Sequence, residues 1–187
     1  MKIVLELLIF ALPVIFAAIF HMVVVKFNVF PFLNYPLDHN KKWRGKPIFG
    51  KNKTYRGLVI MIVFSIFFTF IYKVLADNFP CFNSHNLLNF QIYSFTFYGF
   101  LYGAAYIIAE LPNSFIKRRM GAKEGKSNNI IMVLFDQLDS VIGITLLFIP
   151  FSAFTIKHFF VGILFFGLLH IIINYLLFLI GLRKEKF

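Results

Sequence analysis

Five long stretches of the chain are almost continuously apolar, and polar residues gather in the segments between them. The apolar stretches run over residues 3–25, 58–75, 90–111, 130–154 and 158–182. A membrane-spanning helix needs about 20 mostly apolar residues, and these runs lack the alternating polarity that is typical of barrel strands. The pattern therefore predicts an all-α polytopic membrane protein with about five transmembrane helices in a single integral membrane domain, residues 1–187.

Composition supports this prediction. Hydrophobic residues make up 59% of the 187 residues, charged residues 14%, and Phe alone contributes 28. Soluble domains contain about 45–50% apolar and about 25% charged residues. These values exclude a soluble enzyme and a disordered chain, and the single Cys81 excludes a disulfide scaffold. We expect the first run to be a retained span, because its apolar part is too long for a signal peptide and no small-residue cleavage site follows.

The basic residues predict the orientation. The net charge is +11, and Lys and Arg concentrate in residues 28–57, in residues 112–130 and in the C-terminal tail, whereas residues 77–89 contain none. Cytoplasmic loops carry an excess of Lys and Arg. We therefore expect the N-terminus outside the cell membrane, the C-terminus inside, and both basic loops in the cytoplasm.

The first basic loop has the residue types of an anion site. Lys and Arg alternate with Gly45, Gly50 and Gly57; glycines let backbone N–H groups approach an anion, and the cations neutralise it. The loop also ends at a predicted helix start, where N–H groups attract phosphate. Orientation charge and attraction to anionic lipid heads is the alternative. The candidate phosphate-binding residues are Arg44, Lys46, Asn52, Lys53, Thr54 and Arg56.

Two aspartates near the start of the fourth span form the second candidate site. Asp136 and Asp139 are three residues apart and so share one helix face. Paired carboxylates at a membrane boundary are costly, and a divalent cation such as Mg²⁺, which is commonly held by one or two carboxylates and substrate phosphates, removes that cost. The alternative is that Asp136 caps the helix and Asp139 pairs with an Arg.

Glu110, at the end of the third span, is the third candidate. Pro112 follows it and is predicted to kink or restart the helix. Because the third and fourth spans are antiparallel, Glu110 should lie near the aspartate pair and assist in metal binding; a snorkelling surface acid is the alternative. The polar residues that follow are candidate substrate ligands: Asn113, Ser114, Lys117, Arg118 and Arg119. Acids beside many cations at a membrane face are suited to phosphoryl or nucleotidyl transfer.

Other polar positions favour structural roles. Gly99 and Gly103 predict close helix packing. His170 and Asn174 are one turn apart and favour an interhelical hydrogen bond over a ligand role. His21 and His85 belong to no motif.

Three segments together resemble the CDP-archaeol synthase family, a small relative of the CDP-diacylglycerol synthases. These segments are residues 38–57, 110–119 and 135–143. The first matches the family's Arg-Gly-Lys-x-x-x-Gly-x-Asn-Lys-Thr-x-Arg-Gly from Arg44 to Gly57, and the third matches Phe-Asp-Gln-Leu-Asp-x-x-x-Gly from Phe135 to Gly143. The second departs from the family pattern, because Ala109-Glu110 replaces Gly-Asp and Pro112-Asn113 follows. Within the first segment, Lys51 stands where an acid is often found.

The resemblance implies an Mg²⁺-dependent enzyme that joins CTP to a lipid phosphate similar to archaetidic acid, di-O-geranylgeranylglyceryl phosphate, giving a CDP-lipid and pyrophosphate. Asp136, Asp139 and Glu110 would hold the metal, and Lys53 would act with them. Phosphatidic acid or another lipid phosphate is an alternative substrate, and a non-catalytic transporter or scaffold is an alternative function. The signature of the CDP-alcohol phosphotransferases is absent from the sequence, and no nucleic acid is expected as a partner.

Overall fold

The computed structural model describes residues 2–122, 124 and 130–182. Lys123, Lys126 and the cations of the C-terminal tail lie outside this described part. Within it the chain forms α1 (Lys2–Lys26), a 3₁₀ turn η1 (Pro31–Leu33), a hairpin of β1 (Lys42–Trp43) and β2 (Lys46–Pro47), α2 (Tyr55–Asn78), α3 (Pro80–Ser84), α4 (Phe95–Arg119), α5 (Ile130–Phe148), a 3₁₀ turn η2 (Ile149–Phe151) and α6 (Ile156–Leu179).

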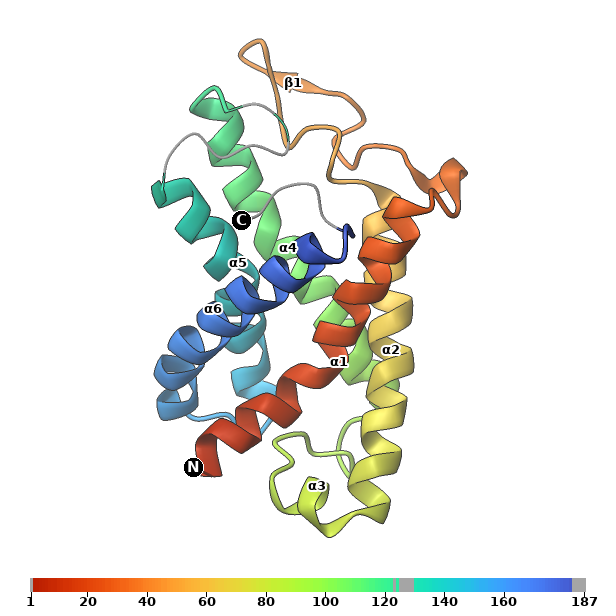
Figure 1. Ribbon diagram of the computed structural model, residues 1–187, viewed down its shortest axis with the longest axis vertical. Coiled ribbons are helices and arrows are strands. Elements are labelled where there is room, and N and C mark those ends of the chain that lie inside the picture. Colours follow the sequence, from red (N-terminus) through yellow and green to blue (C-terminus); the bar gives the residue numbers. More distant parts are fainter. Residues whose placement is uncertain (1, 123, 125–129, 183–187) are drawn as a thin grey trace.

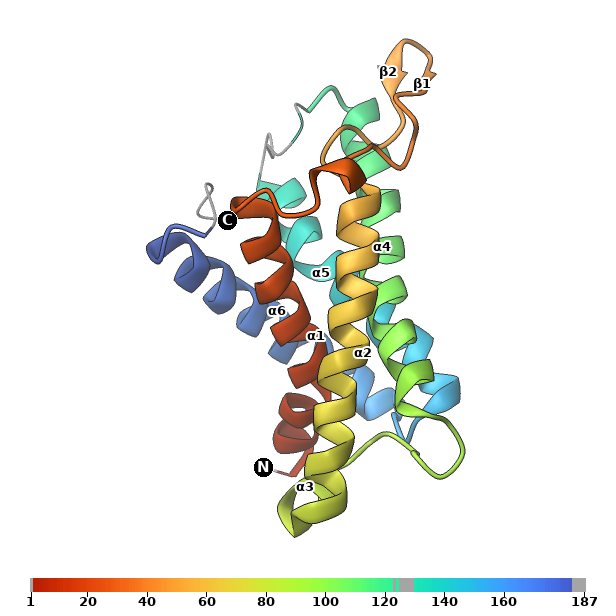
Figure 2. The same ribbon diagram turned by 90° about the vertical axis from the view of Figure 1, so that its right-hand side faces the viewer.

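The five long helices alternate in direction along the chain, as Figures 1 and 2 show. The hairpin and the C-terminal end of α4 lie at one end of the molecule, and α3 and the connection from α5 to α6 lie at the other, which we name the far end. Four helices of the described part are long and apolar enough to cross a membrane: Lys2–Lys26, Tyr55–Asn78, Ile131–Phe151 and Ile156–Leu179. The predicted all-α polytopic membrane class is confirmed, whereas the orientation of the termini stays a prediction.

The remaining long helix, α4, packs closely along α2. It has 25 residues but is not one of the four apolar spans. A Cβ added at Gly99 would lie 2.3 Å from the Ile66 Cα, and one at Gly103 would lie 2.5 Å from the Ile62 Cα. Only a residue without a side chain allows this approach. The predicted packing role of the two glycines is confirmed.

The predicted restart of the helix at Pro112 is wrong, whereas the predicted kink stays a prediction. α4 continues through Pro112 to Arg119, so the second half of the predicted motif is helical rather than loop. Pro removes one backbone donor, but packing against neighbouring helices lets a membrane helix tolerate this loss. The consequence is that Glu110, Asn113 and Lys117 stand on successive turns of one helix.

Aromatic rings fill the core toward the far end. Tyr102 and Phe148 are fully buried, with ring centroids 4.2 Å apart. The Phe10 ring lies 5.3 Å from that of Tyr102, and the Tyr102 hydroxyl donates to the Phe10 carbonyl at 2.7 Å. These aromatic contacts join α1, α4 and α5 in the core.

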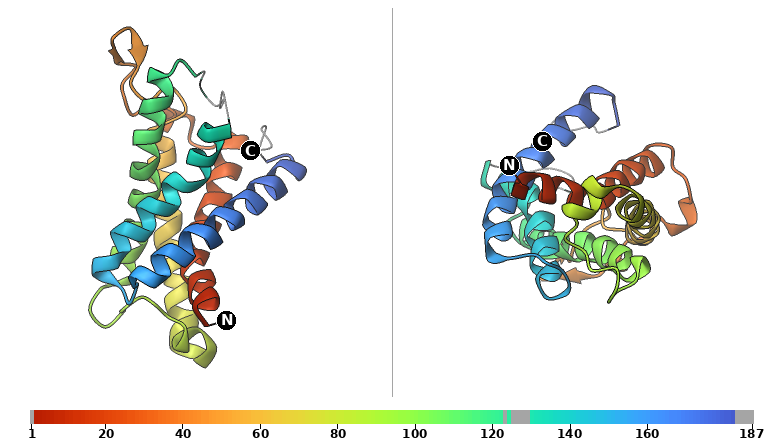
Figure 3. Two further views of the ribbon diagram at one scale, coloured as in Figure 1. Left: turned by 90° about the vertical axis from the view of Figure 1, so that its left-hand side faces the viewer. Right: turned by 90° about the horizontal axis from the view of Figure 1, so that it is seen from below.

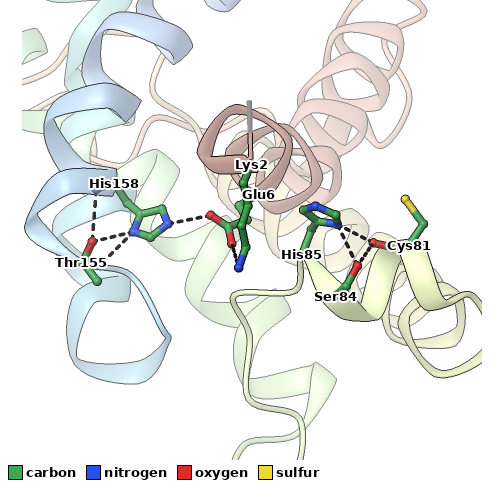
Figure 4. Close-up of polar contacts among 7 residues, drawn as sticks. All are labelled: Lys2, Glu6, Cys81, Ser84, His85, Thr155 and His158. Carbon is green, nitrogen blue, oxygen red and sulfur yellow. Dashed lines mark hydrogen bonds and ion pairs between the residues drawn. The ribbon is translucent and has the colours of Figure 1, made fainter.

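α6 touches α1 and α5 through polar contacts. Near the far end, Glu6 of α1 faces His158 of α6 (Figure 4). Farther along, His170 donates from Nδ1 to the Gln137 carbonyl at 3.0 Å, and Asn174 donates to the Gln137 side chain at 2.8 Å. The predicted interhelical hydrogen bonds of this pair are confirmed. Toward its C-terminal end α6 leans away from the other helices (Figure 3).

Candidate active site

A cavity of about 440 Å³ lies between α1, α4, α5, α6 and the loop before α2. α1 and α6 supply an apolar wall, which includes Phe10, Val14, Ala18, Phe166 and Ile173. The charged part of the lining, which we name the polar end, comes from α4, α5 and the loops beside them: Asn52, Lys53, Glu110, Asn113, Ser114, Lys117, Arg118, Glu124, Asp136, Asp139 and Ser140. One cavity is therefore lined by both charged and apolar side chains.

The aspartate pair sits in the interior of α5 and faces α4. The Asn113 amide donates to Asp136 Oδ1 and to Asp139 Oδ2, at 2.7 Å each. Lys117 Nζ lies 2.7 Å from Asp136 Oδ2 and 3.0 Å from Oδ1. Because α5 begins at Ile130, Asp136 is not a helix cap. Asp139 accepts from Asn113 rather than from an Arg, so the contacts differ from the structural alternative on both points.

Glu110 does not snorkel at the surface. It forms an ion pair with Lys53, and the two side chains are 18% and 22% exposed. Burial lowers the pKa of Lys53, but the adjacent Glu110 carboxylate, with Asp139 and Asp136 behind it, holds the pKa above its ordinary value of 10.5. Lys53 is therefore a cation at every physiological pH.

The polar end fits one divalent cation. Asp136 Oδ1 and Asp139 Oδ2 converge on a single point, which the Asn113 amide nitrogen now occupies. No group of three or more His, Cys, Asp or Glu side chains suited to a metal ion occurs among the described residues. Mg²⁺ needs only one or two carboxylates when substrate phosphates complete its shell. The aspartate pair suits such a site, and the place of Glu110 as a further ligand stays a prediction.

Three predicted phosphate ligands lie outside the cavity, and two of them join the hairpin to α4. Arg44 is exposed at the hairpin turn, where it and Gly45 have φ of 49° and 76°, the geometry of a two-residue turn. Lys46 Nζ donates to the Arg119 carbonyl at 2.8 Å. Arg119 in turn donates to the carbonyls of Trp43, Lys46 and Pro47. These contacts hold the hairpin on the end of α4, and the predicted phosphate roles of these three cations stay predictions.

Two further predicted ligands shape the start of α2. Thr54 caps the helix, since its hydroxyl accepts from the Gly57 N–H at 3.2 Å. Arg56 is buried and donates to the Asn28 side chain at 2.8 Å and to the Val29 carbonyl at 3.3 Å. Neither residue lines the cavity, so both position the loop that carries Asn52 and Lys53. Their direct contact with substrate stays a prediction.

Asp38 organises the same loop. Its carboxylate accepts from the backbone N–H groups of Asn40, Phe49 and Gly50 at 2.9–3.0 Å. Burial raises the pKa of Asp38, but these hydrogen bonds outweigh burial and hold the pKa below its ordinary value of 3.8. The sequence motif included Asp38 without indicating this role.

Sequence reasoning also missed His21 and Glu124. Both line the cavity, and the Glu124 carboxylate accepts from the Lys51 N–H at 3.0 Å. Glu124 lies in a charge-rich loop, where no sequence motif distinguishes a single acid from a solvent-exposed one. His21 did carry a signal, because it ends a series of apolar residues, Phe10, Val14 and Ala18, that recur at helical spacing in the first span.

The comparisons with known proteins agree with the motifs. The family described as CarS-like, CDP-archaeol synthase, matches residues 1–187. A CDP-archaeol synthase of Methanococcoides burtonii is 30% identical over 160 residues, which cover 80% of this chain and 89% of that protein. One of Methanosarcina barkeri is 33% identical over 169 residues with the same shares covered, and one of Methanocaldococcus jannaschii is 32% identical over 111 residues, 58% of each chain.

No solved structure matches the chain. The family match nevertheless extends over the whole length and includes all three motif segments. The resemblance seen in the motifs is confirmed, and with it the class of enzyme. The chain belongs to the CDP-archaeol synthase family, a family of CTP-dependent cytidylyltransferases.

Proposed function

We propose that the protein transfers a cytidylyl group from CTP to di-O-geranylgeranylglyceryl phosphate in the cell membrane, giving a CDP-lipid and pyrophosphate. The observation that supports this most directly is the division of one cavity into an apolar wall and a polar end. CTP is charged and water-soluble, whereas the lipid phosphate is anchored in the bilayer. A site for both must meet the membrane on one side and the cytoplasm on the other. The polar end is lined by residues of the first basic loop and of the C-terminal part of α4, and that part of α4 lies at the same end of the molecule as the hairpin (Figure 1).

The apolar wall suits the lipid. It is built from α1 and α6, and α6 leans away from the bundle beyond the core (Figure 3). Apolar side chains from these two helices would contact the prenyl chains next to the glycerol, while the rest of each chain stays in the bilayer. The phosphate would then reach the polar end, where Lys53 lies.

The chemistry needs no covalent intermediate on the protein. An oxygen of the lipid phosphate, already ionised at neutral pH, attacks the α-phosphorus of CTP and forms the new P–O bond. The bond from that phosphorus to the bridging oxygen of the β-phosphate breaks, and pyrophosphate leaves with the electron pair. Positioning and charge neutralisation are then the main tasks of the protein.

The charged residues of the polar end are suited to those tasks. Asp136 and Asp139 would hold Mg²⁺, which supplies Lewis-acid neutralisation of the triphosphate. Lys117 and Arg118 are both buried beside the cavity and would bind phosphate oxygens. Arg118 Nε has no hydrogen-bond partner in the described part of the chain, so this guanidinium retains a buried donor for a ligand.

The lipid is identified by a product assay. The purified full chain is incubated with CTP, Mg²⁺ and an equimolar mixture of the archaeal-type lipid phosphate and phosphatidic acid, and the products are identified by mass spectrometry. We expect the CDP derivative of the ether lipid to dominate, with one pyrophosphate released per CDP-lipid. A dominant CDP-diacylglycerol would replace the proposed lipid by phosphatidic acid, and absence of any CDP-lipid would contradict the proposed function.

A matched pair of carboxylate variants tests the site. Asp139→Asn keeps the volume and removes the charge of one proposed metal ligand, and we expect it to abolish pyrophosphate release. Asp77→Asn is the control, because Asp77 is an exposed acid at the end of α2 whose partner is Lys73. Full activity of Asp139→Asn, with thermal stability equal to the control, would contradict the assignment.

A further inference from the structure

His21 is a polar side chain in an apolar row. The α1 residues that line the cavity are Phe10, Ala11, Val14, Ile15, Ala18, His21 and Met22. His21 is the polar member of this set and comes last but one along the row. It therefore stands where the apolar wall meets the polar end.

Charged residues surround the imidazole of His21. The ring is close enough to Glu110, Lys53 and Arg56 for all three charges to act on it. Its Nε2 lies against the start of α2, where a Cβ added at Gly57 would be 3.4 Å away. Within the described part of the chain the imidazole makes no hydrogen bond, and it faces the cavity.

A ligand in the cavity can supply a hydrogen-bond partner for this imidazole. In its neutral form the ring has one N–H donor and one acceptor nitrogen, and polar groups in protein interiors are nearly always hydrogen-bonded. Lys53 and Glu110 pair with each other, whereas Arg56 donates to uncharged acceptors, so the corner keeps a net positive charge that favours an anion. An acceptor oxygen with negative charge is therefore the group that fits the N–H of His21.

The position on α1 identifies which anion this is. Ala18, Val14 and Phe10 lie at successive turns below His21, so a lipid whose chains follow this row brings its phosphate to the imidazole. The groups suited to the nucleotide side, Lys117 and the aspartate pair, belong to α4 and α5 instead. Resting on the proposed function, we propose that His21 donates a hydrogen bond to the phosphate of the lipid substrate and holds it for attack on CTP.

A pair of variants of similar length tests this role. His21→Gln keeps an N–H donor, and His21→Met removes it. We expect His21→Met to raise the KM for the lipid phosphate about tenfold or more, the effect of losing a hydrogen bond to a charged group. His21→Gln should recover a large part of the loss, and the KM for CTP should stay within about twofold of wild type in both variants.

His85→Met is the matched control. His85 lies at the far end, where its ring contacts Ser84 and the Cys81 carbonyl (Figure 4), and this variant should leave both KM values unchanged. Turnover by the wild-type protein is measured first, so a failure of the proposed function is seen before the variants are compared. With wild-type turnover present, an unchanged lipid KM in His21→Met, or a rise confined to the KM for CTP, would overturn the proposal. Equal loss in the Gln and Met variants would also overturn it.

Discussion

Buried acids lie at opposite ends of the helices: Glu6 in a far-end cluster with His158 and Lys2, and three acids at the polar end. Their partners differ. In the far-end cluster, Glu6 meets His158 Nε2 at 3.1 Å and Lys2 Nζ at 3.7 Å. His158 also forms a capping box with Thr155 at the start of α6 (Figure 4). One acid is thus surrounded by groups that build and join α1 and α6. We call the far-end cluster closed, because Glu6 and His158 already bind partners within the protein.

The polar end is organised differently. Three acids from two helices share partners from the same region, and a cavity lies between them. Lys53 pairs with Glu110 and Lys117 pairs with Asp136, and the same lysines are suited to phosphate. Desolvated like charges repel each other, so the fold tolerates this crowding only with cations beside it. A buried acid by itself therefore does not indicate a functional site, whereas several acids that line one cavity do.

The largest expected effect is on catalysis and separates the two ends. Glu110→Gln removes the charge opposite Lys53 and one candidate metal ligand, so we expect kcat to fall about a hundredfold or more. Glu6→Gln makes the same change in the far-end cluster and should leave kcat within about twofold. Rates of pyrophosphate release at saturating CTP and lipid measure both. Equal losses in the two variants would remove the distinction between the clusters.

The next effect concerns the lysines. Lys117 is 8% exposed, and Lys117→Met removes the lysine that pairs with the Asp136 carboxylate. We expect a rise of about tenfold or more in the KM for CTP and a loss of about 3 kcal/mol in the free energy of unfolding. Lys73→Met removes an exposed lysine from a pair with Asp77 one helical turn away, and it should cost less than about 0.5 kcal/mol.

Thermal unfolding in detergent and titration with CTP measure these two quantities. A normal KM for CTP combined with the expected destabilisation would give Lys117 a purely structural role. That result would make the polar end resemble the far-end cluster in this one respect.

The sequence predicted the helices and the acids well because both depend on local signals. Apolar run length defines the spans, and the spacing of Asp136 and Asp139 places them on one face of α5. Gly99 and Gly103 predicted close packing for the same reason. The restart expected at Pro112 was wrong, because α4 continues through the proline to Arg119, and packing against neighbouring helices lets a membrane helix tolerate the lost backbone donor.

The sequence could not separate cations that face the cavity from cations that build its frame. Lys53 and Arg119 look alike in a basic loop, yet Lys53 lines the cavity and Arg119 binds the hairpin carbonyls. The difference depends on which backbone carbonyls lie near, and only the folded hairpin determines that. Asn113 likewise joins the two aspartates across helices, a contact that no local spacing reveals.

A smaller effect is expected in the far-end cluster, and it concerns stability. His158→Phe removes the partner of Glu6 and one half of the capping box of α6. We expect a loss of about 1–3 kcal/mol in the free energy of unfolding with kcat and both KM values unchanged. His85→Phe is the control, because His85 is a partly exposed histidine of the same end. A loss of activity at full stability would show that the far-end cluster also serves the reaction.

The smallest effect concerns Asp38. This residue lies in the first basic loop, but its carboxylate, like that of Glu6, already has partners within the protein. Its partners are backbone N–H groups, and its pKa in the folded protein lies below 3.8. A lowered pKa stabilises the fold above the ordinary value, and this contribution is lost as the pH falls through the folded pKa. We therefore expect the loop from Asp38 to Gly50 to loosen only below about pH 4.

Trp43 is the single tryptophan of the chain and stands in the hairpin within this loop, so its fluorescence reports the change. In the wild type the emission should stay constant from pH 7 to about pH 4 and shift below it. In Asp38→Asn the shifted emission should be present at pH 7, because an amide cannot accept from all three N–H groups at once. A wild-type transition above pH 5 would mean that another group controls the loop, and the contrast between closed acids and the crowded acids of the polar end would then not extend to Asp38.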